Sequence, residues 1–248
     1  PPPELKPGDV VNGWAFTGNI SGGRAGHFTV DKDRSRLDAW PIGSKVIPLR
    51  RTPQPVPISG PITLAQLPKP AEQPPEHLPH GARLDYSTKQ WVEIKRIKGG
   101  KSHLPHHLDA QGKAIHKAGP EPWPLWRQEE ALHHGPGCWI AEAEGEKCAD
   151  WLRAGGLVAI SQPGHAHKVE QVADRYRALQ AAGVVGVVYL ADNDDEGKRR
   201  ASQAQEAATL AQLPLLVLPA VEIWSGLPKG GSIDDAPGTP AERVAALV

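Results

Sequence analysis

The sequence predicts an α/β fold, in which a four-stranded parallel sheet is flanked by helices. A smaller β-rich basic subdomain and a Pro-rich N-terminal region precede it. Two observations predict this class. Short apolar runs alternate with amphipathic segments throughout residues 137–248, and glycines separate many of them. Such alternation is typical of βαβ units, whose right-handed crossovers produce a parallel sheet.

The elements of the predicted sheet can be placed by periodicity. Short runs rich in β-branched and apolar residues predict buried strands at 138–143, 157–161, 184–191 and 215–218. Apolar residues at helical spacing predict helices at 146–153, 168–182 and 198–211, and a shorter helix is expected at 128–133. Four strands and three crossover helices therefore form the expected α/β domain.

The chain before this domain divides by composition. Residues 1–50 predict a small β-rich or extended module, because aromatic and apolar residues alternate there with glycine turns. Residues 51–81 are rich in proline, which imposes extended backbone and removes hydrogen-bond donors, so we predict a linker. Residues 82–136 predict a small basic subdomain built on two strands and a polar turn.

Positive charge collects in this subdomain at Lys95, Arg96, Lys98 and Lys101. The four cations either bind a polyanion or protect an exposed edge strand, which proteins often do with lysine. The sequence alone leaves both interpretations open.

Overall composition limits the classes of protein. The 248 residues contain 28 Lys and Arg against 28 Asp and Glu, so net charge argues neither for nor against nucleic acid. No apolar run approaches the roughly 20 residues of a membrane span, and no secretory signal begins the chain. We expect a cytoplasmic protein that does not associate with membranes. Because the chain begins with Pro1 and lacks Met, we expect a piece of a longer protein.

Cysteines and histidines offer little for metal binding. Cys138 and Cys148 are too few for a zinc ribbon, and we expect no disulfide between them. His103, His106 and His107 lack accompanying acids or cysteines at ligand spacing, so a surface loop is favoured over a metal site.

Acidic residues follow the third predicted strand, which we take as the centre of the molecule. Asp192 and Asp194 come where the strand ends, and the carboxyl edge of an open α/β sheet is where ligands bind. Neighbouring carboxylates that stay ionised need a cation, and oxygen ligands favour Mg²⁺ or Mn²⁺. The alternative is a solvated turn that caps a helix. A second acid cluster around Glu144 and a third at Asp234 and Asp235 favour the metal site.

Three motifs in this order resemble the TOPRIM domain, in the variant of bacterial, phage and plasmid DNA primases. They read Glu-Gly-Glu-Lys from Glu144, Asp-Asn-Asp-Asp-Glu-Gly from Asp192, and Lys-Gly-Gly-Ser-Ile-Asp-Asp from Lys229. The resemblance covers about residues 82–236 and is stronger in the second half. The basic segment and residues 122–127 resemble what precedes this domain in phage- and plasmid-type primases. Because two cysteines cannot supply it, we expect this sequence to lack the zinc-ribbon domain of many primases.

The resemblance implies roles for individual residues. Glu144, Asp192 and Asp194 would be catalytic and would hold Mg²⁺ or Mn²⁺, with Asp234 or Asp235 as a further ligand. Two positions depart from the family pattern, because Cys148 and Ser232 stand where primases often have Asp. Both departures affect the number of metal ions.

The implied activity is that of a DNA primase, a DNA-directed nucleotidyltransferase that makes primers in plasmid, phage or mobile-element replication. Its partners would be single-stranded DNA, nucleoside triphosphates and a replicative helicase. Lys95, Arg96, Lys98 and Lys101 would bind template or nucleotide, assisted by Lys147 and Lys198. A TOPRIM nuclease and a non-catalytic DNA-binding replication module remain as alternatives.

Overall fold

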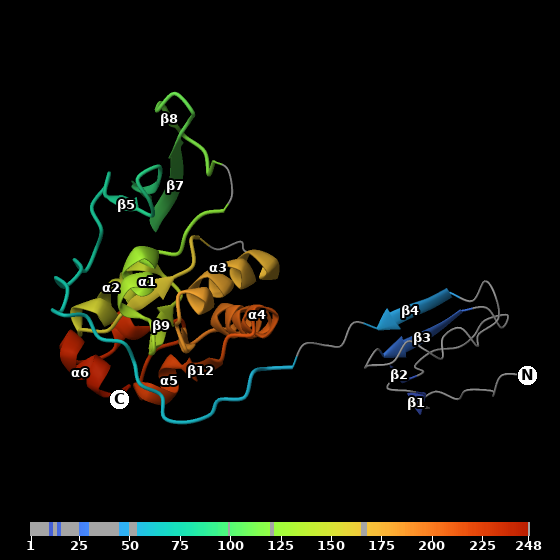
Figure 1. Cartoon of the computed structure of the whole chain (residues 1–248). Helices are drawn as coiled ribbons and strands as arrows, with labels where there is room; N and C mark the ends of the chain where they lie inside the picture. Colours follow the sequence, from blue (N-terminus) through green and yellow to red (C-terminus); the bar gives the residue numbers. More distant parts are fainter. Residues whose placement is uncertain are drawn as a thin grey trace, which may run out of the picture. The chain divides into compact units, whose positions relative to one another are not determined.

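The computed structural model places the chain in two compact units, Pro1–Pro53 and Gln54–Val248. In the first unit the structure describes four strands only. In the second it describes residues 54–98, 100–119, 122–164 and 168–247. The statements below concern these residues (Figure 1).

The described residues of the N-terminal unit form short strands. β1 (Val10–Val11) pairs antiparallel with β2 (Trp14–Ala15), and β3 (Ala25–Thr29) pairs parallel with β4 (Lys45–Leu49). The rest of this predicted module lies outside the described residues.

The Pro-rich segment differs from the free spacer expected for residues 51–81. Ala65 is 2% exposed, and its backbone N–H donates to Trp139 O at 2.7 Å while its carbonyl accepts from Val158 N at 2.9 Å. Leu67 N donates to Gly156 O, and Ala71 N donates to Arg153 O. Proline removes donors only at its own positions, so the residues between can still pair with the body.

The basic subdomain is a four-stranded antiparallel sheet in the order β5-β6-β7-β8. Its core side contributes Leu84, Val92 and Ile94. The sheet contains the predicted strands. The surface loop predicted for His103, His106 and His107 is wrong, because these residues lie in β7. The strands are β5 (Arg83–Asp85), β6 (Gln90–Ile97), β7 (Gly100–Leu108) and β8 (Ala114–Ile115).

The α/β domain has the predicted parallel sheet, in the order β10-β9-β11-β12. Because the chain runs from β9 out to β10 and returns to β11 on the other side of β9, the strand order reverses between β9 and β11. The strands are β9 (Trp139–Ala143), β10 (Ala159–Ser161), β11 (Gly186–Ala191) and β12 (Leu215–Pro219). The helices are α1 (Gln128–His134), α2 (Glu146–Ala154), α3 (Val169–Ala181), α4 (Asp195–Ala211), α5 (Ala220–Ile223) and α6 (Pro240–Ala245).

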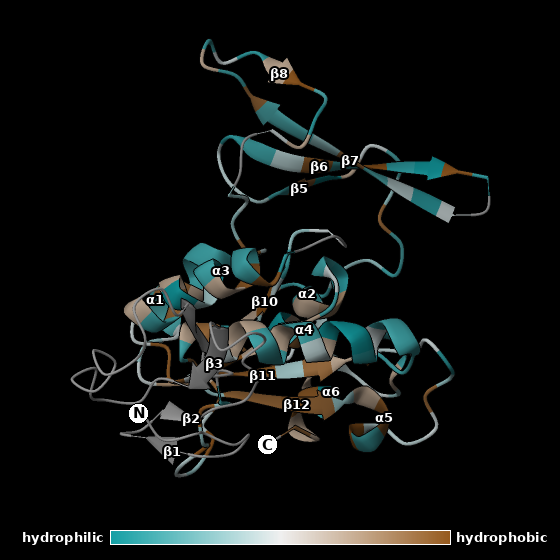
Figure 2. Cartoon of the chain, turned by 90° about the vertical axis from the view of Figure 1, so that its right-hand side faces the viewer, coloured by the Kyte–Doolittle hydropathy of each residue, from teal (hydrophilic) through white to brown (hydrophobic). Residues whose placement is uncertain are grey.

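Each face of the sheet carries its own core. Alternate residues of β9 point to opposite sides: Ala141 and Ala143 pack with Leu152 of α2, and Ile140 packs with Tyr176 of α3. Helices α2 and α6 accordingly lie on one side of β9, and helices α3 and α4 lie on the other (Figure 1). Hydrophobic colour concentrates on the strands between the helices (Figure 2).

One boundary matters for the site. The helix predicted to begin at Lys198 begins three residues earlier, at Asp195, because the Asp194 side chain accepts from Gly197 N at 2.7 Å and caps it. The acidic segment after β11 is therefore partly helical. No helix in the described part of the chain is long and apolar enough to cross a membrane.

Candidate active site at the carboxyl edge of the sheet

Two of the predicted acids follow neighbouring strands. Ala143 of β9 stands opposite Leu190 of β11, so Glu144 and Asp192 leave the sheet at almost the same level. This point is also where the strand order reverses, which is the usual ligand position in an open α/β sheet.

Glu144 is held by the loop that follows β11. Its Oε1 accepts from the backbone N–H of Asp192 at 3.0 Å. Arg200 of α4 donates to the Glu144 carbonyl at 3.2 Å and lies 3.6 Å from Oε2. Burial raises the pKa of Glu144, and the Asp192 N–H and Arg200 oppose this effect. Arg200, which the sequence analysis did not single out, is thus a cation in contact with Glu144.

Asp192 is the acid least compensated by its surroundings. Its carboxylate accepts no hydrogen bond from the described residues, and Arg200 is a weaker influence on it than its acidic neighbours. Burial raises its pKa to about 8, and the charges of Glu144, Asp194 and Asp234 add to the shift. Glu144, Asp194 and Asp234, which come from three separate motifs, therefore all lie close enough for their charges to act on Asp192.

The two carboxylate oxygens of Asp194 face different parts of the site. Its Oδ1 caps α4 by accepting from Gly197 N, which confirms the capping function weighed as an alternative. Its Oδ2 faces the third motif, 3.7 Å from where a Cβ on Gly230 would lie. Gly197 has no room for a side chain, since a Cβ there would lie 2.9 Å from Glu144 Oε1 and would also strike Asp192 O.

The third motif is anchored to the second by backbone contacts. Asn193 N donates to Gly231 O at 2.9 Å, and Gly230 N donates to Asn193 O at 2.8 Å. The Asn193 amide also donates to Pro228 O at 3.0 Å. These bonds bring the segment that carries Asp234 to the sheet edge.

Asp234 and Asp235 are already engaged. Lys147 Nζ donates to Asp234 Oδ2 at 2.7 Å, and the Ser232 hydroxyl and the Cys148 thiol donate to Oδ1. Burial opposes ionisation of Asp234, but Lys147 and Ser232 outweigh it, and the pKa of Asp234 lies below its ordinary value. Asp235 is exposed and accepts from Ser232 N at 3.1 Å. Both cysteines are free thiols.

A buried carboxyl group that the sequence analysis did not single out lies beneath Glu144. Glu142 is fully buried and accepts from Tyr176 OH at 2.8 Å and from the Gln162 amide at 2.9 Å. Burial raises its pKa to about 7, and the two hydrogen bonds moderate the rise. Its position in the middle of an apolar strand gave no sign of this network.

The predicted basic residues are exposed at the tip of the β6–β7 hairpin. Arg96 donates from Nε and Nη2 to Leu78 O at 3.1 and 2.9 Å, and Arg96 stands opposite Lys101 across the two strands. None of Lys95, Arg96, Lys98 and Lys101 forms an ion pair with an acid in the described residues. The tip projects to the side where β11 and β12 end (Figure 2). The basic residues therefore lie on the same side of the molecule as the acids, but they do not contact them.

The remaining predicted cations differ from each other. Lys147 lies inside the site, on Asp234, with a side chain 20% exposed. Lys198 lies on the surface of α4, and its side chain is 79% exposed beside Asp195 at 3.3 Å.

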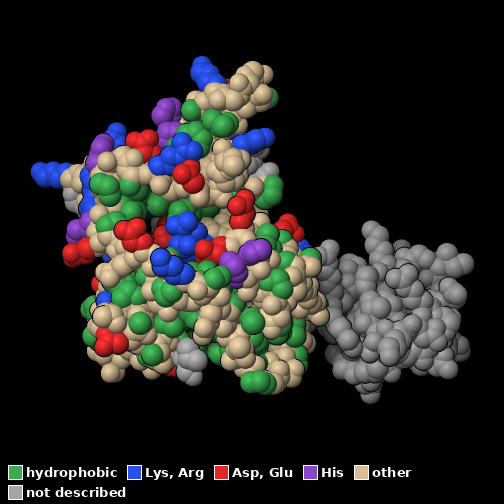
Figure 3. All heavy atoms as spheres, turned by 60° about the vertical axis from the view of Figure 1, so that its left-hand side comes forward, with side chains coloured by type: hydrophobic (Ala, Val, Ile, Leu, Met, Phe, Trp, Pro, Cys, Tyr) green, Lys and Arg blue, Asp and Glu red, His purple; other side chains and the backbone are tan. Residues whose placement is uncertain are grey.

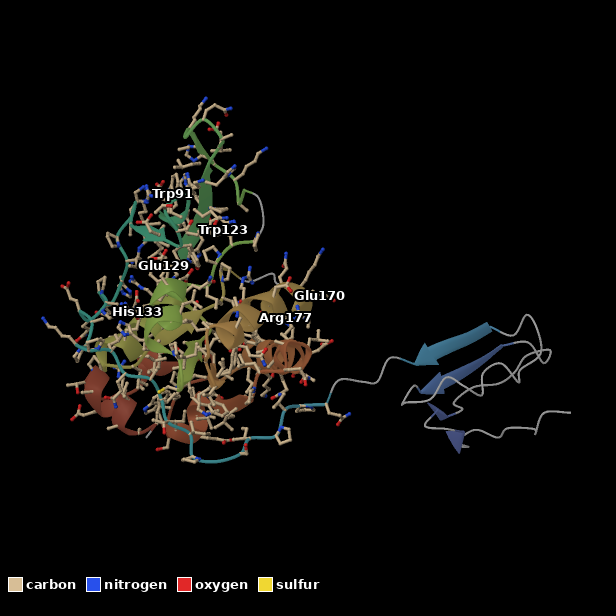
Figure 4. The ribbon with its side chains drawn as sticks, viewed as in Figure 1. Trp91, Trp123, Glu129, His133, Glu170 and Arg177 are labelled. Carbon is tan, nitrogen blue, oxygen red and sulfur yellow. The ribbon has the colours of Figure 1, made fainter. Side chains whose placement is uncertain are left out.

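Tyr86, which follows β5, and Arg127, which precedes α1, both contact α2, the helix that begins two residues after Glu144. The Tyr86 hydroxyl donates to Glu146, and Arg127 Nε donates to Asp150 Oδ1 at 3.1 Å. A cleft of about 580 Å³ lies between the β5–β6 turn and α1, lined by residues of both charges. Basic and acidic side chains are intermixed on the face shown in Figure 3, and Trp91 and Trp123 lie above Glu129 and His133 of α1 in Figure 4.

The donor set of the edge fits a hard divalent cation. Glu144, Asp192 and Asp194 offer carboxylate oxygens, and Asp192 combines partial burial with a carboxylate that has no hydrogen-bond partner in the described residues. In the part of the chain that the structure describes, no three His, Cys, Asp or Glu side chains are already grouped as ligands. Repulsion among the carboxylates keeps them apart when no cation draws them together, and Glu144 and Asp194 each accept a backbone N–H instead.

Comparisons with known proteins give a distant likeness to a solved structure. No family model matches the sequence, and a search of curated proteins finds no match. Among solved structures, the chain is similar to the crystal structure of a DNA primase domain from Pseudomonas aeruginosa, at 18% identity and a TM-score of 0.35. The likeness covers 65% of this chain and 48% of that one, so the chain spans about half the length of that domain.

Proposed function

We propose that the protein is a DNA primase that uses a TOPRIM-type carboxylate site for metal-dependent nucleotidyl transfer. The observation that carries this proposal is the meeting of Glu144, Asp192 and Asp194 at the switch point of the sheet. The order of the three motifs supports it.

In this proposal Glu144, Asp192 and Asp194 hold Mg²⁺ or Mn²⁺. A divalent cation bound there would lower the pKa of an attacking 3′-hydroxyl and neutralise triphosphate charge. Arg200 keeps Glu144 in place through its carbonyl and carboxylate, and Gly197 lets the loop after β11 approach Glu144 closely.

Template binding is assigned to the exposed hairpin tip. The facing pair Arg96 and Lys101 places like charges opposite each other, which costs stability unless an anion lies between or near them. A phosphodiester backbone supplies such an anion. Single-stranded DNA and nucleoside triphosphates are the proposed partners, together with a replicative helicase.

Incubation of the protein with single-stranded DNA, labelled nucleotides and Mg²⁺ or Mn²⁺ tests the reaction type. A gel should show products that depend on template, nucleotide and metal. Metal-dependent cutting of DNA without nucleotides would assign the same residues to a nuclease, because the cation then activates water. Binding of DNA without either product would leave a non-catalytic replication module.

A further inference from the structure

The carboxylate edge is divided into a neutralised half and an uncompensated half. Asp234 accepts from the Lys147 ammonium at 2.7 Å and from the Ser232 hydroxyl and the Cys148 thiol. The Asp192 carboxylate accepts no hydrogen bond from the described residues, although the Asp192 carbonyl accepts from Asp194 N at 2.9 Å. The two halves are neighbours, because the charge of Asp234 acts on Asp192.

The neutralised half offers poor ligands to a divalent cation. An ammonium is a compact point charge, and a dication at Asp234 would have to displace it or lie beside it. Cys148 is buried, and its burial raises the pKa of the thiol, so the sulfur keeps its proton. Asp235 is turned to the backbone of Ser232.

We propose that this edge binds one divalent cation, through Glu144, Asp192 and Asp194, and that the Lys147 ammonium occupies the place of a second. The inference rests on the proposed function for the presence of the first cation. It makes Lys147 a positioning residue and removes Asp234 and Asp235 from the ligand set.

The test is a titration of the whole protein with Mn²⁺, in which electron paramagnetic resonance counts the free ion. Wild type, Lys147→Arg and the surface control Lys89→Ala should each bind about one Mn²⁺ per chain. Lys147→Ala should bind about two, because Asp234 is then free next to Asp192. Lys147→Gln provides a second variant without the charge, and thermal melting shows that each variant is folded.

Two further variants separate the halves. Asp192→Asn should weaken Mn²⁺ binding at least about tenfold, and Asp234→Asn should change it less than about threefold. Two Mn²⁺ in the wild type, one in both folded Lys147 variants, or equal losses for the two aspartates would overturn the inference. Absence of Mn²⁺ binding would overturn it as well. Primer synthesis is measured separately, so one bound Mn²⁺ without synthesis would reject the primase and keep the inference.

Discussion

At the scale of single residues, the site consists of carboxylates with different surroundings. Glu144 and Asp194 each accept a backbone N–H, Asp234 carries an ammonium, and Asp192 has none of these. A bound cation should therefore interact most favourably with the Asp192 carboxylate. Replacing Asp192 should affect stability and activity in opposite directions.

Asp192→Asn should leave the melting temperature without metal unchanged or higher. The substitution keeps the shape and removes a partly buried charge that lies near Glu144, Asp194 and Asp234, so a gain of about 1 kcal/mol is expected. Thermal unfolding in a chelator measures the change. A large drop in melting temperature would instead mean that the loop needs this carboxylate for its own structure.

Asp194 should show its capping role in a pair of variants. Asp194→Ala removes the acceptor for Gly197 N and should cost about 1 kcal/mol of unfolding free energy. Asp194→Asn keeps an acceptor and should cost much less, because Asn is also a good N-cap. Urea unfolding of both variants checks this, and equal losses would contradict the cap. Primer synthesis should fail in both variants.

At the scale of elements, the β5–β8 sheet contains a buried histidine. His106 is 3% exposed, stacks on Trp91 at a centroid distance of 5.2 Å, and its Nε2 has no hydrogen-bond partner in the described part. Burial and the nearby His116 lower its pKa, and Glu93 opposes them. Arg83 is the further charge that acts on it.

The stability of this sheet should therefore fall in mild acid. Because the pKa of folded His106 lies below its unfolded value of about 6.5, the unfolded state takes up the proton first as pH decreases. The free energy of unfolding, measured in urea at pH 7.5 and 5.5, should decrease, and the decrease should be smaller in His106→Phe. His77→Gln, which replaces an exposed histidine outside this sheet, is the control. A loss of equal size in His106→Phe would assign the pH effect to other groups.

The hairpin tip should matter more for synthesis than a lysine elsewhere on the sheet. If the tip holds phosphates, Lys98→Ala/Lys101→Ala should slow primer synthesis at least about a hundredfold, near 2.7 kcal/mol. Lys95→Ala/Arg96→Ala should do the same, although it also removes the Arg96 contact with Leu78 O.

Lys89→Ala/Lys113→Ala is the matched control, since both lysines are exposed in turns of the same sheet. It should stay within about threefold of the wild type. Initial rates and DNA affinity are compared at one salt concentration. Tip variants that also remain within threefold would identify the lysines as protection for an exposed strand.

At the scale of the whole molecule, the α/β pattern was predictable because the strands are short apolar runs, most of them bounded by glycine, proline or acids. The shared location of the acids that follow β9 and β11 was also predictable, since neighbouring parallel strands end at the same edge of the sheet. Three features were not. The path of residues 63–71 along the sheet depends on backbone donors that proline-rich composition conceals. The Arg200–Glu144 pair and the Tyr86–Glu146 bond join segments 56 and 60 residues apart, which no local periodicity reports.

The central claim is that the carboxylates at the ends of β9 and β11 form the catalytic centre. The most direct test compares initial rates of template-dependent primer synthesis for the wild type, Asp192→Asn and Asp235→Asn at saturating Mg²⁺. Asp192→Asn should lose at least about a hundredfold, near 2.7 kcal/mol, and Asp235→Asn, which alters an exposed carboxylate bonded to Ser232 N, should stay within about threefold. Synthesis by Asp192→Asn at the wild-type rate would contradict the account.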